Sequence, residues 1–279
     1  MRVGVSLPIR EMSGDFAAII DFAQAAEELG LTHLRIPDQI MRPGSGYVNE
    51  PMMLLAHIAA VTEKIELVPS VIILPARDTV YFGKQAAELD NLSGGRLRIG
   101  VGVGGSDAEY GYLGKEFSNR GRRCSEQMRL LQELWLKEEV EFSGDFHNVS
   151  GAGLNPLPVQ RPIPMWVGGR AIPSRAVIER IGQISNGWFV LCGPNEIEEI
   201  RAKIAAEAIK VGRSAGEIGE EAGVAVVGER EHEWKKRVKE WKKIGLSHLC
   251  LRTLGGGLKV SQHVERLQEV IKELPEALA

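Results

Sequence analysis

Polar side chains stand directly after several apolar, strand-like runs, where they could reach a bound ligand. Asp38 and Gln39 follow the run His33–Pro37. A carboxylate at such a position can orient a planar ring, and an amide can hydrogen-bond a carbonyl group. Glu109, further along the chain, is a second candidate acid. The alternative for Asp38 is that its side chain only caps a turn.

A second segment is rich in glycine. Gly100, Gly102 and Gly105 match the spacing of a dinucleotide-binding fingerprint. The context does not fit, because the match lies in the fourth strand-like run and the next good helix begins only near Ser118. Glycines at the end of a strand would instead let a large planar ligand approach the backbone. Tight packing inside the fold is the alternative.

A third segment could bind an anion. Gly168, Gly169 and Arg170 follow the apolar run Met165–Val167, and Ser174 opens a helical stretch. Free amides at a helix N-terminus and the helix dipole both favour a phosphate group. We therefore predict a phosphate site at this turn.

Metal and nucleophile chemistry have little support. The six histidines and three cysteines show no metal-ligand or disulfide spacing, and no Gly-x-Ser-x-Gly elbow occurs. His57 lies on an apolar helix face and is interpreted as a structural histidine, and Cys192 as a small packing residue. No metal site is predicted.

These segments must be positioned by an alternation of short apolar runs with stretches of helical period. The eight predicted strands are Val3–Leu7, His33–Pro37, Ile65–Leu74, Leu97–Gly104, Ile163–Val167, Gly187–Leu191, Gly223–Val227 and His248–Leu254. The eight predicted helices lie near Phe16–Leu29, Met52–Thr62, Val80–Leu92, Ser118–Leu136, Ser174–Ile184, Asn195–Val211, His232–Ile244 and Ser261–Leu274. Because these units leave little chain for loops, we predict an α/β fold, a closed (β/α)8 TIM barrel, over an open doubly wound sheet.

Two stretches depart from this alternation. Proline and serine inside the apolar run Val68–Pro75 predict a bulge near Ser70. Alternating apolar residues around the Ser143–Asp145 turn predict a short hairpin or lid, inserted before the fifth strand within Lys137–Arg161. Since the strands of a parallel barrel end at one mouth, the polar segments above are predicted to form one site there.

The composition narrows the class of protein. Apolar residues make up 44% and charged residues 25% of the 279 residues, as in a globular protein with a full core. The formal charge of -3 argues against nucleic acid and membrane surfaces as partners. Scattered cysteines and a strand-like N-terminus favour a reducing cytoplasm. We expect one domain over residues 1–279.

Taken together, these motifs resemble the luciferase-like monooxygenase superfamily over nearly the whole chain. The resemblance rests on Leu29–Leu31 leading to Asp38, Ser70-Val71 with Leu74–Asp78, Ala87–Arg96, Gly100–Gly102 with Arg120–Arg123, and Pro164–Gly169. It implies a (β/α)8 barrel that uses FMN or the deazaflavin coenzyme F420. The short chain looks most like the deazaflavin-dependent branch.

The resemblance also implies where the cofactor lies. Family members often have a non-proline cis peptide that backs the flavin ring, and Ser70-Val71 falls on it. The implied ring pocket comprises Leu7, Pro8, Asp38, Ser70, Val71, and Gly102 to Gly104. The implied phosphate site comprises Gly168, Gly169, Arg170 and Ser174.

One residue departs from the family pattern. Deazaflavin enzymes of this group commonly carry histidine directly after the aspartate, where this chain has Gln39. A glutamine can hold a carbonyl but cannot carry protons near neutral pH. If an acid is needed, Glu109 or His57 must serve, or the reaction is a hydride transfer with solvent as the proton source. Asp38 and Glu109 are expected to be exposed, so that alanine at either lowers turnover more than thermal stability.

The expected function is therefore F420-dependent hydride transfer to or from a small organic substrate. One alternative is an FMN-dependent monooxygenase served by a partner flavin reductase. Another is a catalytically silent flavin-binding barrel, which Gln39 keeps open. A homodimeric assembly is left open, and the loops that would shape a substrate pocket have no readable code.

Overall fold

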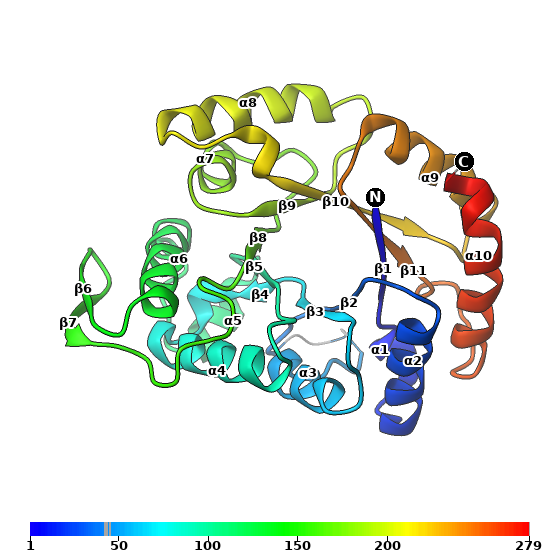
Figure 1. The fold of residues 1–279 in the computed structure, drawn as a ribbon, viewed down its shortest axis with the longest axis horizontal. Coiled ribbons are helices and arrows are strands. Elements are labelled where there is room, and N and C mark those ends of the chain that lie inside the picture. The colour runs from blue at the N-terminus through cyan, green and yellow to red at the C-terminus, as the bar shows by residue number, and fades with distance from the viewer. Residues whose placement is uncertain (42–43, 45, 279) are drawn as a thin grey trace.

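Parallel strands close into a barrel in the computed structural model, which describes residues 1–41, 44 and 46–278 (Figure 1). The strands of the sheet are β1 (Arg2–Ser6), β2 (His33–Ile36), β3 (Glu66–Pro69), β4 (Ile72–Ile73), β5 (Ile99–Gly102), β8 (Met165–Val167), β9 (Gly187–Val190), β10 (Gly219–Ala225) and β11 (His248–Arg252). They follow one another in the order β3-β2-β1-β11-β10-β9-β8-β5-β4.

The ring closes through the third barrel strand, which is made of two segments. β3 pairs with β2, and β4 pairs with β5. A parallel bridge between Leu67 and Leu97 joins β3 to the chain just before β5. With β3 and β4 counted as one strand, the sheet forms an eight-stranded barrel, which confirms the predicted (β/α)8 fold. The interruption between β3 and β4 falls at Ser70 and Val71, where the bulge was predicted.

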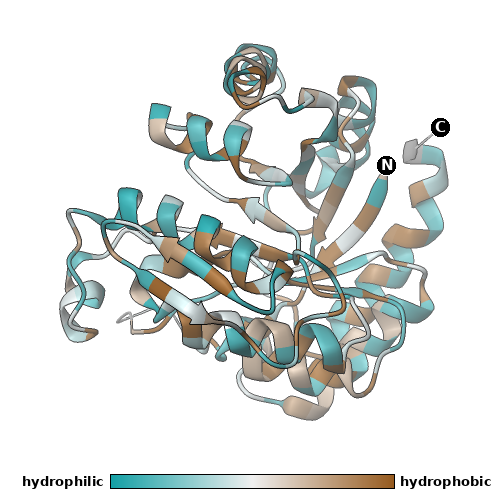
Figure 2. Cartoon of the chain, turned by 60° about the vertical axis from the view of Figure 1, so that its left-hand side comes forward, coloured by the Kyte–Doolittle hydropathy of each residue, from teal (hydrophilic) through white to brown (hydrophobic). Residues whose placement is uncertain are grey.

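Helices surround the barrel, as the periodicity predicts. They are α1 (Ile9–Met12), α2 (Phe16–Glu28), α3 (Pro51–Ala59), α4 (Thr79–Leu92), α5 (Asp107–Tyr112), α6 (Arg120–Leu136), α7 (Arg175–Gln183), α8 (Ile197–Lys210), α9 (Trp234–Ile244) and α10 (Gln262–Leu278). Figure 2 shows brown and teal segments alternating along these helices, as expected for helices with one face on the barrel. None of the described helices combines the length and apolar composition needed to cross a membrane.

The insertion before the fifth barrel strand is the predicted hairpin. β6 (Val140–Ser143) and β7 (Asn148–Ala152) pair antiparallel and project to one side of the barrel in Figure 1. Glu126 of α6 anchors the turn, because its carboxylate accepts hydrogen bonds from the backbone amides of Asp145 at 2.7 Å and Phe146 at 2.9 Å.

The seventh barrel strand and the short helices α1 and α5 differ from the sequence prediction. The seventh barrel strand begins at Gly219 rather than Gly223, because charged Glu220 and Glu221 belong to it. A short helix, α5, precedes α6 and was not predicted. It begins where the Ser106 hydroxyl accepts a hydrogen bond from the amide of Glu109 at 3.2 Å, which is a side-chain N-cap.

Candidate active site at the mouth of the barrel

Two adjoining cavities open at the carboxyl ends of the barrel strands. The first, of about 350 Å³, is called the arginine cavity because Arg10, Arg35, Arg237 and Arg252 line it. The second, of about 550 Å³, is called the glycine cavity because Gly104 and Gly105 form part of its wall. Pro37 and Ser70 line both, so the two cavities meet at the ends of β2 and β3.

Most of the predicted ring pocket gathers around these cavities. The glycine cavity is lined by six predicted site residues: Asp38, Gln39, Ser70, Val71, Gly104 and Glu109. Leu7 and Pro8 line the arginine cavity instead. The remaining predicted residues, Gly102, Gly168, Gly169, Arg170 and Ser174, are outside both sets of lining residues.

Ser70 lines both cavities and Val71 lines the glycine cavity, and the peptide bond that joins them is cis, as the resemblance implied. The Ser70 hydroxyl oxygen accepts hydrogen bonds from Arg35 Nε at 3.0 Å and Nη2 at 2.6 Å. A Cβ atom on Gly102 or on Gly168 would lie 2.5 Å from a methyl group of Val71. Both glycines therefore make room for Val71. At Gly102 the packing alternative accounts for the missing side chain, and at Gly168 the same packing accounts for it where a phosphate contact was predicted.

Asp38 holds two segments of the mouth together. Its Oδ2 accepts a hydrogen bond from the amide of Ile73 at 2.9 Å, and its Oδ1 accepts one from Arg77 Nη2 at 2.9 Å. Only 1% of the side chain is exposed, and burial raises the pKa of this carboxyl. The expectation that Asp38 is exposed is wrong, and its replacement by alanine would also strip partners from Ile73 and Arg77.

Glu109 holds the neighbouring loop in the same way. Its Oε1 accepts hydrogen bonds from the amides of Ile40 at 2.9 Å and Met41 at 3.0 Å, and the residue is 3% exposed. The expectation of an exposed acid is wrong here too, so alanine at Glu109 would lower stability as well as any turnover. Gln39, which lines the same cavity, accepts a hydrogen bond from Arg10 Nη2 at 3.3 Å. His57 is exposed on α3 and lines neither cavity.

The predicted phosphate site lies in the loop between β8 and α7. Ser174 is the N-cap residue of α7 and makes no side-chain cap hydrogen bond. Gly169 is exposed, and a Cβ atom there would meet only Val177, at an ordinary contact distance of 3.4 Å. The amide of Gly168 is already used, because it donates to the carbonyl of Val101 at 2.8 Å. Gly169 and the start of α7 therefore remain the open part of this turn.

Beneath the arginine cavity, charged side chains meet inside the barrel. Glu221 is fully buried, and its carboxylate accepts hydrogen bonds from Arg35 Nη1 at 2.8 Å and Arg98 Nη1 at 3.0 Å. Burial opposes ionisation of Glu221, but His33, Arg35 and Arg98 hold its pKa well below the usual value. Since Arg35 also binds Ser70, this ion-pair network supports the residue shared by the two cavities.

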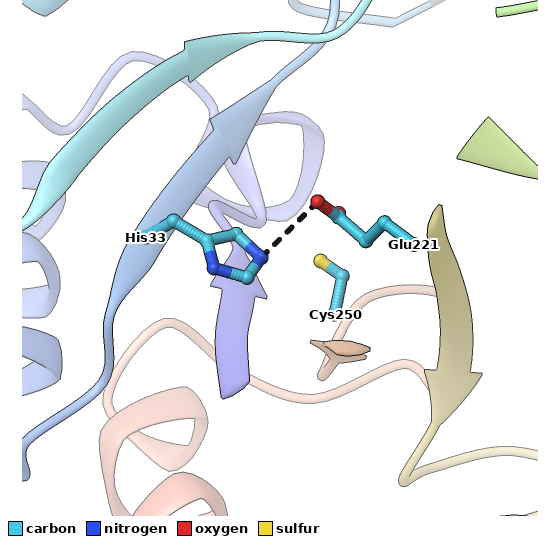
Figure 3. A group of neighbouring side chains, drawn as sticks. All are labelled: His33, Glu221 and Cys250. Atoms are coloured by element: carbon cyan, nitrogen blue, oxygen red, sulfur yellow. Dashed lines mark ion pairs between the residues drawn. The ribbon is translucent and has the colours of Figure 1, made fainter. Parts of the chain in front are cut away.

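His33, Glu221 and Cys250 point toward one another from β2, β10 and β11 (Figure 3). One potential ligand atom of each lies within 4.8 Å of the others, a group that sequence spacing did not reveal. The chemistry disfavours a cation, because Arg35 and Arg98 already neutralise the carboxylate. Burial raises the pKa of the Cys250 thiol to about 12, which keeps it protonated. We interpret the group as part of the ion-pair network.

His248, beside this network, makes folding sensitive to pH. Burial and the charge of Arg98 lower its pKa to about 3, so the folded protein keeps it neutral where the unfolded chain binds a proton. The contribution of His248 to the free energy of unfolding is therefore complete above pH 6.5. It is lost as the pH falls toward 3, by up to about 1.4 kcal/mol per pH unit. Urea unfolding at pH 7.0 and 5.0 should show this loss, and His248→Gln should reduce it. An equal reduction in His232→Gln, a replacement of an exposed histidine, would contradict the assignment.

The closed barrel defines the chain as a (β/α)8-barrel protein, and its two cavities open at the carboxyl ends of the strands, where such barrels carry their sites. The model of the luciferase-like monooxygenase family matches residues 1–265. The chain therefore belongs to this family.

Relatives of known activity divide between two cofactors. The FMNH2-dependent dimethylsulfone monooxygenase of Pseudomonas putida is 30% identical over 180 residues, which cover 62% of this chain and 49% of the relative. The F420-dependent glucose-6-phosphate dehydrogenase of Gordonia bronchialis is 29% identical over 182 residues, which cover 63% of this chain and 53% of the relative. Both matches span about half the length of those relatives. Both relatives are oxidoreductases, which supports oxidoreductase chemistry at the general level.

Among solved structures, the monooxygenase RslO1 from Streptomyces bottropensis superposes with a TM-score of 0.82. The match covers 100% of both chains at 19% sequence identity. This likeness supports the barrel fold independently of the sequence motifs.

Proposed function

We propose that this protein is an F420-dependent oxidoreductase that transfers a hydride between the deazaflavin ring and a small organic substrate. The observation that carries the proposal is the pair of adjoining cavities that share Pro37 and Ser70. A hydride donor and its acceptor must lie in contact, and two cavities that share Pro37 and Ser70 at one mouth suit that requirement.

The residues present fit such a cofactor. The glycine cavity is bounded by Gly104, Gly105, Ser70 and Val71, and a Cβ atom on Gly105 would meet nothing within 4 Å, which leaves a space suited to a flat ring. The open turn at Gly169 and the uncapped start of α7 suit its phosphate. When bound, the deazaflavin supplies or accepts the hydride.

The chain would mainly position the reactants. Asp38 and Glu109 fix the loops around the glycine cavity through backbone amides, and Arg35 fixes the hydroxyl of Ser70. The amide of Gln39 does not titrate, so it can orient a carbonyl but cannot deliver a proton. This arrangement supports a reaction in which hydride transfer is the chemical step and solvent supplies the proton.

An FMN-dependent monooxygenase is the second candidate, and the dimethylsulfone monooxygenase at 30% identity favours it. In that case a partner flavin reductase would deliver the reduced flavin. A small-molecule substrate is part of both proposals, and a homodimer is compatible with both.

We expect F420 to bind at least about tenfold more tightly than FMN, a difference near 1.4 kcal/mol. The physical reason for this preference lies in the loop between β8 and α7, where we predict the phosphate site. Gly169 and Arg170 are exposed, so the part of F420 that continues beyond its phosphate can extend there and contact the Arg170 guanidinium. FMN ends at its phosphate and gains nothing from that contact. Fluorescence titrations of the purified protein with each cofactor measure the difference.

Turnover then separates the candidate functions. Steady-state reduction or oxidation of F420 with a panel of alcohols and carbonyl compounds supports the proposal. Tighter binding of FMN, with oxygen consumption in the presence of a flavin reductase, would replace it by the monooxygenase. Binding without turnover of either cofactor would indicate the catalytically silent barrel.

A further inference from the structure

Two guanidinium groups, of Arg237 and Arg252, lie beside the backbone of β10 at Gly223 in the arginine cavity. Arg237 of α9 directs its Nη2 toward the carbonyl oxygen of Gly223, at 3.5 Å. A Cβ atom on Gly223 would lie 3.4 Å from Nε of Arg252, the last residue of β11. The absence of a side chain at Gly223 therefore lets the Arg252 guanidinium lie against the backbone of β10 at the cavity wall.

These arginines have no acidic partner in the cavity. Over residues 1–41, 44 and 46–278, no carboxylate lies within 4.0 Å of a guanidinium nitrogen of Arg10, Arg237 or Arg252. Glu221 also lines the cavity, but Arg35 and Arg98 occupy both of its oxygens. The wall that Arg237 and Arg252 form is therefore positively charged, with no directly paired carboxylate among the described residues.

The electrostatics of Arg237 agree with this. Burial lowers its pKa first, and the charges of Arg230 and Arg252 lower it further, while Glu233 and Glu240 act in the opposite direction. A negative charge bound between Arg237 and Arg252 would relieve their repulsion and supply the missing partner.

The other walls suit a small organic molecule. Leu7, Phe189 and Leu191 supply apolar surface, and the volume of about 350 Å³ is in the range of small-ligand sites. Apolar walls with a few convergent cationic groups would bind a molecule by its carbon frame and orient it by one charged end.

We propose that the arginine cavity is a substrate subsite in which Arg237 and Arg252 bind an anionic group, a carboxylate or a phosphate monoester. The role of substrate rests on the proposed function, since the cavity adjoins the glycine cavity at Ser70. The binding of an anion does not require the cofactor, so it can be tested separately.

The test is calorimetric titration of the cofactor-free protein with succinate and, separately, with inorganic phosphate. Phosphate is also titrated into Gly169→Asp, so that binding at the turn before α7 is not counted. We expect Arg237→Gln and Arg252→Gln each to weaken binding of the preferred anion about tenfold, as loss of one charge-assisted hydrogen bond would. Arg129→Gln, an exposed arginine on α6, is the matched control and should bind as the wild type does.

The outcomes separate the two proposals. Succinate binding that depends on Arg237 and Arg252 assigns a carboxylate subsite, and phosphate binding with that dependence assigns a phosphate subsite. If either result occurs in a protein that binds no cofactor, the subsite stands and the proposed function falls. If neither anion binds, or both folded arginine variants bind with wild-type affinity, the subsite is overturned, whatever the cofactor titrations show.

Discussion

Glu221→Gln is expected to lower the free energy of unfolding by about 3–5 kcal/mol, because it leaves buried cations without their counter-charge. Glu221 is fully buried between Arg35 and Arg98, of which only 19% and 3% of the side chains are exposed. Glutamine has nearly the same shape as glutamate, so packing changes little. Its amide can accept from one guanidinium, but it must then present its NH2 group to the other.

The loss should also reach the mouth of the barrel. Arg35 spans the network, donating to Glu221 through Nη1 and to Ser70 through Nε and Nη2. Without the carboxylate, Arg35 is no longer held on its inner side, so Ser70 loses a fixed partner. Glu221→Gln should therefore weaken cofactor binding even under conditions where the variant is folded.

Urea denaturation measures this effect, and Glu220→Gln is its matched control. Glu220 is the preceding residue of β10 and pairs with Arg201 rather than with the barrel interior. Glu220→Gln should lower the free energy of unfolding by no more than about 1 kcal/mol, as for the loss of a partly exposed ion pair. Equal losses in the two variants, or an unchanged midpoint for Glu221→Gln, would show that the interior network does not stabilise the fold.

The sequence predicts the barrel well because its period is carried by many residues at once. The alternation of apolar runs with helical faces predicted all eight barrel strands, and the Ser143–Asp145 turn predicted the hairpin. The seventh strand was placed late because Glu220 and Glu221 interrupt its apolar pattern. Inside a closed barrel, a charged residue can occupy a strand when cations from other strands neutralise it, which a local pattern does not reveal.

The site is predicted less completely, for a related reason. Motifs marked Asp38, Ser70 and Glu109, and the structure places all three on one cavity. Their burial and hydrogen bonds depend on segments distant in sequence, so both acids were expected to be exposed. Arg35 stands in the run before Asp38, but its role appears only when β10 brings Glu221 beside it.

The glycines show the same limit. A glycine at the end of a strand indicates that something approaches closely, but the sequence does not say whether this is a ligand or another side chain. At Gly102 and Gly168 the neighbour is a side chain, because each glycine lies against one of the two methyl groups of Val71. At Gly169 a side chain would meet only Val177, so this glycine alone of the three leaves space open toward solvent.

Gly169→Asp should abolish cofactor binding while leaving the barrel folded, and this is the largest functional effect that we expect. Gly169 is exposed, and its φ angle is not among the positive values found at other glycines, so aspartate can adopt its backbone conformation. A carboxylate at this turn would oppose a phosphate at the start of α7 by like charge and fill the space that the phosphate needs. A loss of about 3 kcal/mol in the free energy of cofactor binding would weaken the affinity by more than a hundredfold.

Two further variants separate charge from packing in this turn. Gly169→Asn adds nearly the same volume without the charge, so it should retain more affinity than Gly169→Asp. Gly168→Ala should instead destabilise the barrel, because its Cβ atom would lie 2.5 Å from Val71. Circular dichroism reports folding, and fluorescence titration with F420 and FMN reports binding. A folded Gly169→Asp protein with wild-type affinity for either cofactor would mean that the phosphate of that cofactor lies elsewhere, because no tight phosphate contact at this turn could tolerate the added charge.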